Sequence, residues 1–177
     1  MLNSYLRGMQ IQVLNSQPSD INTIFQFYDM AVEHQKKVFN KHWQGFSKTL
    51  IETEIADNRQ YKILVDDEVA CVFAVTFNDK LIWGDRDKDS VYIHRIVTHP
   101  NYRGYSFVKE IIKWGKLFAP KNGIKFIRMD TWADNDKLFE YYTSCGFNFA
   151  GTVTMEQTEG LPKHYEGISL NLFEIEV

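Results

Sequence analysis

The 177-residue sequence contains little cysteine, little proline and no large excess of one charge, and each shortage excludes a class of protein. Its two cysteines, Cys71 and Cys145, are too far apart to form the paired spacing of a disulfide framework or a zinc site. Four prolines and the absence of a Gly/Ser-rich tract leave no sign of a linker. A net charge of -3 offers no broad attraction for a phosphate backbone, which argues against nucleic acid as a partner.

Long apolar runs are also missing. No segment reaches the ~18 apolar residues of a membrane span, and the first residues, Met1 to Gly8, lack the apolar core of a signal peptide. We therefore expect a cytoplasmic protein with no membrane partner. The simplest organisation is an N-terminal extension of residues 1–8 followed by a single domain of residues 9–177.

Apolar periodicity and turn residues divide the rest of the chain into strands and helices. Strands are expected at residues 9–14, 61–65, 69–77, 91–98, 125–131, 146–155 and 167–174. Helices are expected from the Pro18-Ser19-Asp20 cap to Val38 and at about 48–58, 105–118 and 134–144, with the polar segment 78–90 as a loop. This order predicts an α/β fold (α+β mixed sheet): a central, mixed, mostly antiparallel sheet of about seven strands with helices on both faces.

The most informative feature is the connection between the strand that ends at Thr98 and the helix that follows. A tight turn there leaves unpaired N–H groups at the positive end of a helix, which suits a pyrophosphate. Neither a Walker A motif nor a Gly-x-Gly-x-x-Gly fingerprint is present, which disfavours nucleoside triphosphates and NAD. By itself, the turn also fits an ordinary strand-to-helix connection.

Two motifs together resemble the GNAT superfamily of acetyl-CoA-dependent N-acyltransferases. The stretch T-H-P-N-Y-R-G-Y-S-F-V is similar to the family's Arg/Gln-x-x-Gly-x-Gly/Ala turn, with Arg103 in the first position. Ser106 and Val108 stand where the family has its small residues, and they narrow the space in which backbone approaches phosphate. The second motif resembles the family's next segment and consists of Asp130-Thr131-Trp132-Ala133-Asp134-Asn135, Leu138, Tyr142 and Cys145-Gly146-Phe147.

The resemblance covers about residues 9–177 in element order and is most specific between Val91 and Phe147. It implies an N-acetyltransferase in which an amine attacks acetyl-CoA directly in a ternary complex. The implied cofactor-binding residues are Ile96, Val97, Thr98, Arg103, Gly104, Tyr105, Ser106, Phe107, Val108, Asn135, Lys137 and Tyr142. Within this set the strand would hold pantetheine by backbone hydrogen bonds, and the turn would hold the pyrophosphate. Lys109 or Lys137 would reach a remaining phosphate, or would simply face solvent.

Two side chains are predicted to be catalytic. An alkylamine has a pKa of about 10.4, so deprotonating it at pH 7 costs roughly 4.6 kcal/mol, and a base is expected. His94 matches a histidine implicated in proton removal in the arylalkylamine acetyltransferase branch; alternatively it only packs in the sheet, and water is the base. Tyr142 matches the family tyrosine proposed to protonate the departing thiolate; alternatively it is a core residue of an amphipathic helix.

The acceptor amine, a small molecule or a peptide, is expected to bind the first two helices, the segment 78–90 and the loop from Thr158 to Tyr165. No histidine or cysteine pair has metal-ligand spacing, so no metal is expected. A catalytically weak acyl-CoA-binding or regulatory module of the same fold is the alternative function, and a homodimer stays open.

Overall fold

The computed structural model describes residues 8–39, 41–156, 159 and 166–177. Over these residues the strands are β1 Ile11–Asn15, β2 Gln60–Val65, β3 Glu68–Thr76, β4 Ser90–Thr98, β5 Phe126–Trp132, β6 Asn148–Thr154 and β7 Ser169–Glu176. The α-helices are α1 Ile21–Val38, α2 Lys48–Ala56, α3 Lys80–Trp83, α4 Phe107–Phe118 and α5 Asp136–Cys145. In the described part of the chain, no helix is both long enough and apolar enough to span a membrane.

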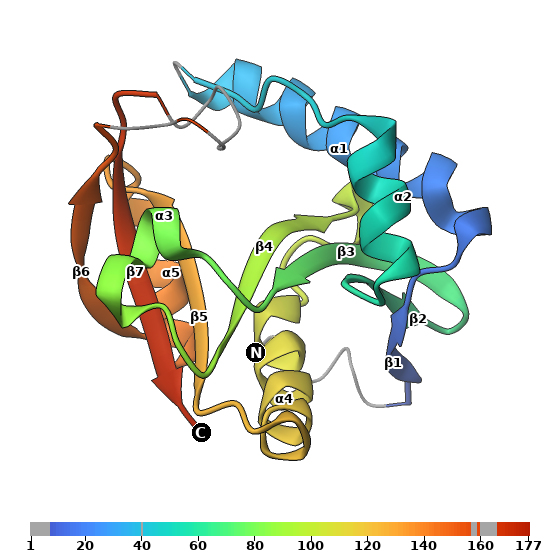
Figure 1. Cartoon of the computed structure of the whole chain (residues 1–177). Coiled ribbons are helices and arrows are strands. Elements are labelled where there is room, and N and C mark those ends of the chain that lie inside the picture. Colours follow the sequence, from blue (N-terminus) through green and yellow to red (C-terminus); the bar gives the residue numbers. More distant parts are fainter. Residues whose placement is uncertain (1–7, 40, 157–158, 160–165) are drawn as a thin grey trace. The chain divides into compact units, whose positions relative to one another are not determined.

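The strands form one sheet in the order β1-β2-β3-β4-β5-β7-β6 (Figure 1). β4 and β5 pair in parallel, whereas β1 with β2, β2 with β3, β5 with β7 and β6 with β7 pair antiparallel. The predicted mixed α/β fold with about seven strands is therefore confirmed. The chain also clusters into two compact units, Met1–Val75 with Arg95–Ile111 and Thr76–His94 with Ile112–Val177.

In the first unit, helices α1 and α2 share an apolar core with the strands. Its buried members are Ile24, Phe27, Tyr28, Ile51, Ile55, Val72 and Val97. Ser47 caps α2 by accepting a hydrogen bond from the Leu50 amide at 3.2 Å, as its position before the helix predicted. Asp66 and Asp67 both adopt a positive φ in the turn between β2 and β3, which makes the connection a two-residue hairpin.

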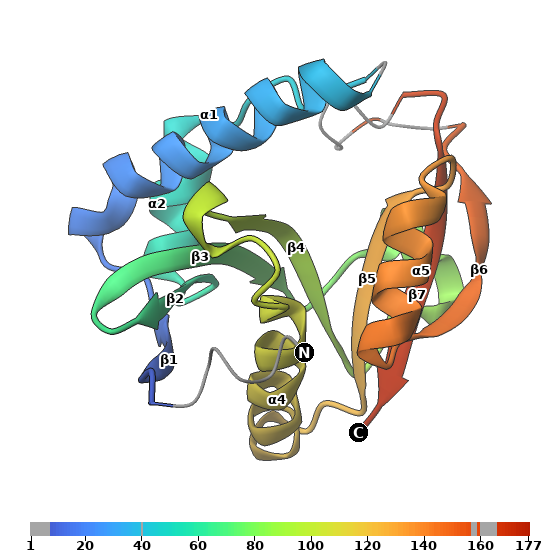
Figure 2. The same cartoon turned by 180° about the vertical axis from the view of Figure 1, so that it is seen from behind.

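In the second unit, α5 packs on β7 and β5 follows the last part of α4. The Phe139 and Tyr142 rings of α5 lie 5.5 and 5.7 Å from the Phe173 ring of β7. Gly115 of α4 is so close to β5 that a Cβ there would lie 2.7 Å from Ile127 Cδ1. Figure 2 shows α5 on one face of β5, β7 and β6, and α3 lies on the other face, as Figure 1 shows from the opposite side.

The segment 78–90 is not the simple loop that its polar sequence predicted. It contains α3 and a turn of 3-10 helix at Gly84–Arg86, and it buries Ile82 and Trp83. The indole of Trp83 packs 5.7 Å from the Tyr92 ring and 4.4 Å from the Arg128 guanidinium. A four-residue helix is too short to produce a periodic pattern, and its stability comes from these tertiary contacts.

Two predicted helix starts also shift. α4 begins at Phe107 and not near Tyr105, because Ser106 has a φ of 57°, which a right-handed helix does not allow. α5 begins at Asp136 because Asn135 caps it. The predicted loop from Thr158 to Tyr165 lies, apart from Glu159, outside the described residues.

Candidate active site

The parallel pairing of β4 with β5 positions the central residues of the site. Val91 is level with Ile127, and Tyr92 is level with Arg128. Side chains two residues apart on a strand share a face of the sheet. His94 and Asp130 each follow this last pair by two residues, so both lie on the same face as Tyr92 and Arg128.

In the pair of Tyr92 and Arg128, the guanidinium of Arg128 is fully hydrogen-bonded. Arg128 donates from Nε to Glu174 at 3.0 Å, from Nη1 to the Ser90 hydroxyl at 3.0 Å, and to the carbonyl oxygen of Arg86. Its guanidinium also lies between the rings of Trp83 and Phe126, at 4.4 and 4.5 Å. This buried cation is neutralised and hydrogen-bonded, so it anchors the segment around α3 to the sheet.

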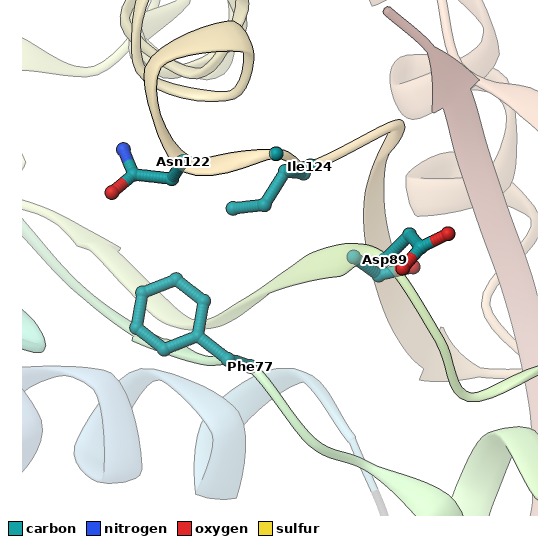
Figure 3. A pocket seen from close by; sticks show the side chains of 6 residues that line it. Phe77, Asp89, Asn122 and Ile124 are labelled. Atoms are coloured by element: carbon teal, nitrogen blue, oxygen red, sulfur yellow. The ribbon is translucent and has the colours of Figure 1, made fainter.

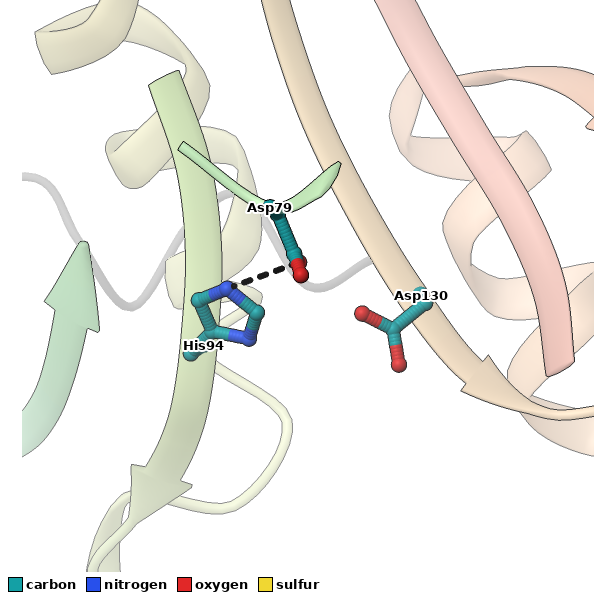
Figure 4. Close-up of side chains that lie close together, drawn as sticks. All are labelled: Asp79, His94 and Asp130. Carbon is teal, nitrogen blue, oxygen red and sulfur yellow. Dashed lines mark ion pairs between the residues drawn. The ribbon is translucent and has the colours of Figure 1, made fainter. Parts of the chain in front are cut away.

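His94 and Asp130 belong, together with Asp79, to a cluster of three titratable side chains. One potential ligand atom from each residue lies within 4.8 Å of the others. His94 Nε2 is 3.3 Å from Asp79 Oδ2. Figure 4 shows the three side chains converging from β4, from β5 and from the segment that precedes α3. The segment before α3 thus adds a second carboxylate to the histidine of β4 and the aspartate of β5.

Asp79 occupies the N-cap position of α3, but its side chain does not cap that helix. Its backbone is held at both ends: its amide donates to Asp87 Oδ1 at 3.0 Å, and its carbonyl accepts from the Trp83 amide at 2.9 Å. The side chain is only 9% exposed, and its Oδ2 atom is buried without a hydrogen-bond partner among the described residues. The carboxylate is thus directed at His94 and keeps unused acceptor capacity.

The pKa of Asp130 is raised to about 6: burial is the largest cause, the charge of His94 acts in the opposite direction, and the negative charge of Asp79 adds to the rise. A carboxylic acid with such a pKa exchanges its proton close to neutral pH. The cluster therefore combines two carboxylates and one imidazole in a place where protons are readily accepted and released.

Arg95, the next residue of β4, belongs to the first unit and binds Glu54 there. It has a φ of 52°, a left-handed conformation that is rare for a residue with a long side chain. Its guanidinium donates from Nη2 to both Glu54 oxygens, at 2.5 and 2.6 Å, and Glu54 is buried on α2. This ion pair holds an irregular backbone turn in β4 directly before Ile96, Val97 and Thr98.

The predicted phosphate-binding turn is also shaped by left-handed residues. Gly104 and Ser106 have φ values of 89° and 57°, so Ser106 takes a conformation that glycine adopts without strain. Phe107 and Val108 are buried as the helix begins, whereas Arg103 and Gly104 are exposed and Tyr105 is half-buried. The turn thus combines an exposed arginine with the start of a 12-residue helix.

Helix α5 carries the remaining predicted residues. Asn135 is 7% exposed; its Oδ1 accepts from the Leu138 amide at 3.1 Å, and its Nδ2 is buried without a hydrogen-bond partner among the described residues. Tyr142 is 9% exposed, two turns further along the helix, and its ring is 6.4 Å from that of Phe147. Lys137 is exposed. Asn135 and Tyr142 thus share the buried side of α5.

The predicted residues fall into separate groups. Ile96, Val97, Thr98 and the turn from Arg103 to Val108 belong to the first unit, while His94, Asn135, Lys137 and Tyr142 belong to the second. Sequence reasoning missed Asp79, and it noted Asp130 only as part of a motif. The usable signals were the aspartate Asp130 within a largely buried strand and an aspartate before a short helix.

The cysteine nearest these residues cannot serve as a nucleophile at neutral pH. Cys71 is fully buried, and burial raises the pKa of its thiol to about 12. Its contact with the Thr98 hydroxyl, at 3.8 Å, is a weak one. A mechanism that passes the acyl group through this thiol is therefore disfavoured.

A separate pocket in the second unit lacks comparable chemistry. It holds about 320 Å³ and is lined by Phe77, Asp89, Ser90, Asn122, Gly123 and Ile124 (Figure 3). Asp89 is exposed, and its hydrogen bond and ion pair with Lys125 at 2.9 Å lower its pKa. Asp89 is therefore charged at neutral pH and is a poor proton acceptor.

Comparisons with known proteins identify the family and support the fold. The model of the acetyltransferase (GNAT) family matches residues 24–147. YesJ of Bacillus subtilis, described as an uncharacterized N-acetyltransferase, is 30% identical over 126 residues, which is 63% of this chain and 67% of YesJ. A GNAT-family acetyltransferase of Listeria monocytogenes has a similar structure, with a TM-score of 0.74 at 20% identity over 94% of this chain and 95% of that one.

The structure of yncA from Salmonella typhimurium, solved with its cofactor acetyl-CoA, gives a TM-score of 0.65 at 13% identity and covers 94% of this chain and 93% of that one. Because their sequence identities are low, the two solved structures support the fold alone. The family match extends over well more than half of the sequence and includes residues of both units. The chain therefore belongs to the GNAT acetyltransferase family, and acyltransferase activity is what this family implies.

Proposed function

We propose that the protein is an N-acetyltransferase that transfers the acetyl group of acetyl-CoA to an amine by direct attack in a ternary complex. Family membership supports the reaction class. The observation that carries the proposal is the cluster of Asp79, His94 and Asp130, because amine acetylation requires a group that removes a proton from the attacking nitrogen.

The chain's own residues fit acetyl-CoA in two places. Gly104 and Ser106 hold the left-handed turn that exposes amides ahead of α4, and such amides bind phosphate. Asn135 keeps a buried Nδ2 donor without a partner among the described residues, although its Oδ1 is used by the helix cap. A donor of this kind is suited to a carbonyl oxygen of the pantetheine arm. Acetyl-CoA, when bound, supplies the activated thioester.

Each proposed catalytic side chain has one task. As the amine nitrogen forms its bond to the thioester carbon, His94 accepts the proton that the nitrogen loses, and Asp79 stabilises the resulting imidazolium from 3.3 Å. When the carbon–sulfur bond breaks, the Tyr142 hydroxyl donates a hydrogen bond or a proton to the thiolate. In this proposal the backbone amides of Ile96 to Thr98, which follow the left-handed residue Arg95, polarise the thioester carbonyl.

Thiol release and product mass test the proposal directly. The purified protein is incubated with acetyl-CoA and a panel of alkylamines, arylamines, amino acids and peptides, while free thiol is followed and products are identified by mass spectrometry. We expect amine-dependent thiol release and an acetylated amine. If acetyl-CoA does not bind at about millimolar concentration, the proposal fails.

The alternative function, a regulatory module that binds acyl-CoA without turnover, is supported by one observation. Ser106 carries a side chain in a left-handed turn where the family motif has a glycine. Strain of this kind is of order 1–2 kcal/mol and weakens the turn. Tight acetyl-CoA binding with no acetylated product across the whole panel would favour this alternative.

A further inference from the structure

The side chain of Asp87 joins the segment that carries Asp79 to the strand that carries His94. Its Oδ1 atom accepts one hydrogen bond from the Asp79 amide at 3.0 Å and another from the Tyr92 hydroxyl at 2.7 Å. Tyr92 precedes His94 by two residues on β4, so these two side chains lie on the same face of the sheet. One carboxylate oxygen therefore links the backbone of Asp79 to the strand face that presents His94.

Both ends of this link are fixed by further contacts. The Asp87 amide donates, at 3.1 Å, to the carbonyl oxygen at the start of the preceding 3-10 turn. The Tyr92 side chain is fully buried, and its hydroxyl accepts a hydrogen bond from Arg128 Nη1 at 3.4 Å. The Tyr92 ring lies 5.7 Å from that of Trp83, in the helix that follows Asp79. Asp87 thus ties Asp79 to buried side chains of the second unit.

The direction of the Asp79 carboxylate depends on how its backbone is held. Figure 4 shows this side chain pointing toward His94, whose Nε2 atom is 3.3 Å from Asp79 Oδ2. That oxygen is buried without a hydrogen bond among the described residues, and the side chain does not cap α3. The Asp79 backbone, in contrast, bonds to Asp87 through its amide and to the Ile82 and Trp83 amides through its carbonyl. These backbone bonds therefore set the place of the carboxylate.

We propose that Asp87 is a positioning residue, which holds the Asp79 carboxylate beside the imidazole of His94. This inference rests on the proposed function, in which Asp79 stabilises the imidazolium that forms when His94 accepts a proton. Asp87 is not itself a catalytic residue, because its side chain bonds to Asp79 and Tyr92 and acts through them. The position of a catalytic group matters for the rate, since a displacement of about 1 Å costs about 100-fold.

Two substitutions at Asp87 separate its hydrogen bonds from its charge. Asp87→Ala leaves the Asp79 amide and the Tyr92 hydroxyl without their acceptor, so kcat should fall at least about tenfold. Asp87→Asn removes the charge but keeps a carbonyl oxygen that accepts both bonds, so kcat should stay within a factor of about three. Asp85→Ala, at an exposed position of the same 3-10 turn, is the matched control and should leave kcat unchanged. An asparagine variant as impaired as the alanine variant would contradict the inference.

A double-mutant cycle tests whether Asp87 acts through Asp79. In the Asp79→Asn background the charge to be positioned is already absent, so adding Asp87→Ala should change kcat by less than about twofold. The dissociation constant for acetyl-CoA should stay the same throughout the cycle. Effects of the two substitutions that simply multiply would overturn the inference. If Asp87→Ala does not fold, Tyr92→Phe removes one of the two donors and keeps the ring; its loss of kcat, about threefold, should vanish in the Asp79→Asn background, and a loss that persists there contradicts the inference.

Hydrogen exchange tests the anchor without any substrate. The Asp79 amide is followed by NMR, and the amide of the fully buried Ile127 in β5 serves as the reference for global opening. Relative to this reference, exchange at Asp79 should become at least about tenfold faster in Asp87→Ala and stay the same in Asp87→Asn. An unchanged rate in Asp87→Ala would overturn the inference. If the wild type acetylates no amine, the proposed function fails, and the exchange rates still decide whether Asp87 anchors Asp79.

Discussion

His94 and Arg95 are consecutive residues of β4, yet the two charge clusters to which they belong differ in kind. Arg95 meets one carboxylate, Glu54, through contacts of 2.5 and 2.6 Å, so the charges cancel. His94 meets two carboxylates, and one of their oxygens has no hydrogen bond among the described residues. A compensated pair stabilises a fold, whereas an uncompensated cluster destabilises it and is expected where function requires it.

The largest effect is expected when the compensated pair is broken. Glu54→Ala leaves the Arg95 guanidinium buried without its counter-charge, so the free energy of unfolding should fall by about 3–5 kcal/mol. Urea unfolding measures this change. Glu52→Ala, on the exposed side of the same helix, loses only a surface contact to Lys48 and should change stability by less than about 0.5 kcal/mol. Equal effects of the two substitutions would contradict the comparison.

A substitution at His94, in the cluster with Asp79 and Asp130, should lower activity and not stability. His94→Gln removes the proton acceptor but keeps a similar volume, so kcat should fall about 100-fold while the dissociation constant for acetyl-CoA is unchanged. Stopped-flow thiol release and calorimetry give the two quantities. A kcat within a factor of about two of the wild type would assign the base to water.

Two buried tyrosines, Tyr142 of the second unit and Tyr28 of the first, allow the same comparison with smaller expected effects. Tyr142→Phe should lower kcat roughly 10-fold or more and spare acetyl-CoA binding, because the thiolate loses its donor. Tyr28→Phe in the first unit removes only a hydrogen bond of 3.3 Å to Gln60 and should reduce stability by about 1 kcal/mol without changing kcat. The same assays apply to both variants, and an unchanged kcat for Tyr142→Phe would remove this residue from the mechanism.

Asp130→Asn should change stability only above about pH 4, and the sign of its effect is opposite to that of Glu54→Ala. The raised pKa of Asp130, about 6, means that the folded state binds this proton more tightly than the unfolded state. The wild type therefore loses stability as the pH rises from about 4 to about 6, and the asparagine variant does not. At about pH 7.5 the variant should be more stable by up to about 3 kcal/mol, because a pKa raised from 3.8 to about 6 corresponds to that free energy, and near pH 4 the two should be equal. Thermal unfolding across this range checks both expectations, and a less stable variant at pH 7.5 would be inconsistent with a functional cost at Asp130.

Most of the fold could be predicted from the sequence because its elements have strong local signals. The long apolar stripe of α1, the Ser47 cap and the Asp66-Asp67 turn each specify an element without reference to the rest of the chain. The helix α3 was missed because four residues cannot show a period and its buried Trp83 is explained only by contacts to Tyr92 and Arg128.

The candidate site was only partly predictable, for a similar reason. Ser106 was recognised as a departure from the family motif, but its left-handed backbone is a property of the folded turn. Asp79, His94 and Asp130 are far apart in sequence and meet through the register of β4 with β5 and the fixed backbone before α3. No spacing rule within the sequence connects them. The roles predicted for His94, Tyr142 and the cofactor-binding residues stay predictions.

The pH dependence of kcat/KM for an alkylamine is the most direct test of whether the uncompensated cluster is the proton acceptor. Asp130 lies close to Asp79 and His94, and burial, opposed by His94 and aided by Asp79, raises its pKa to about 6. We expect kcat/KM to rise through about pH 6 in the wild type, in addition to the rise caused by the amine itself, and this step to shift or disappear in Asp130→Asn. A profile that rises only with the pKa of the amine and is the same in both proteins would contradict the assignment.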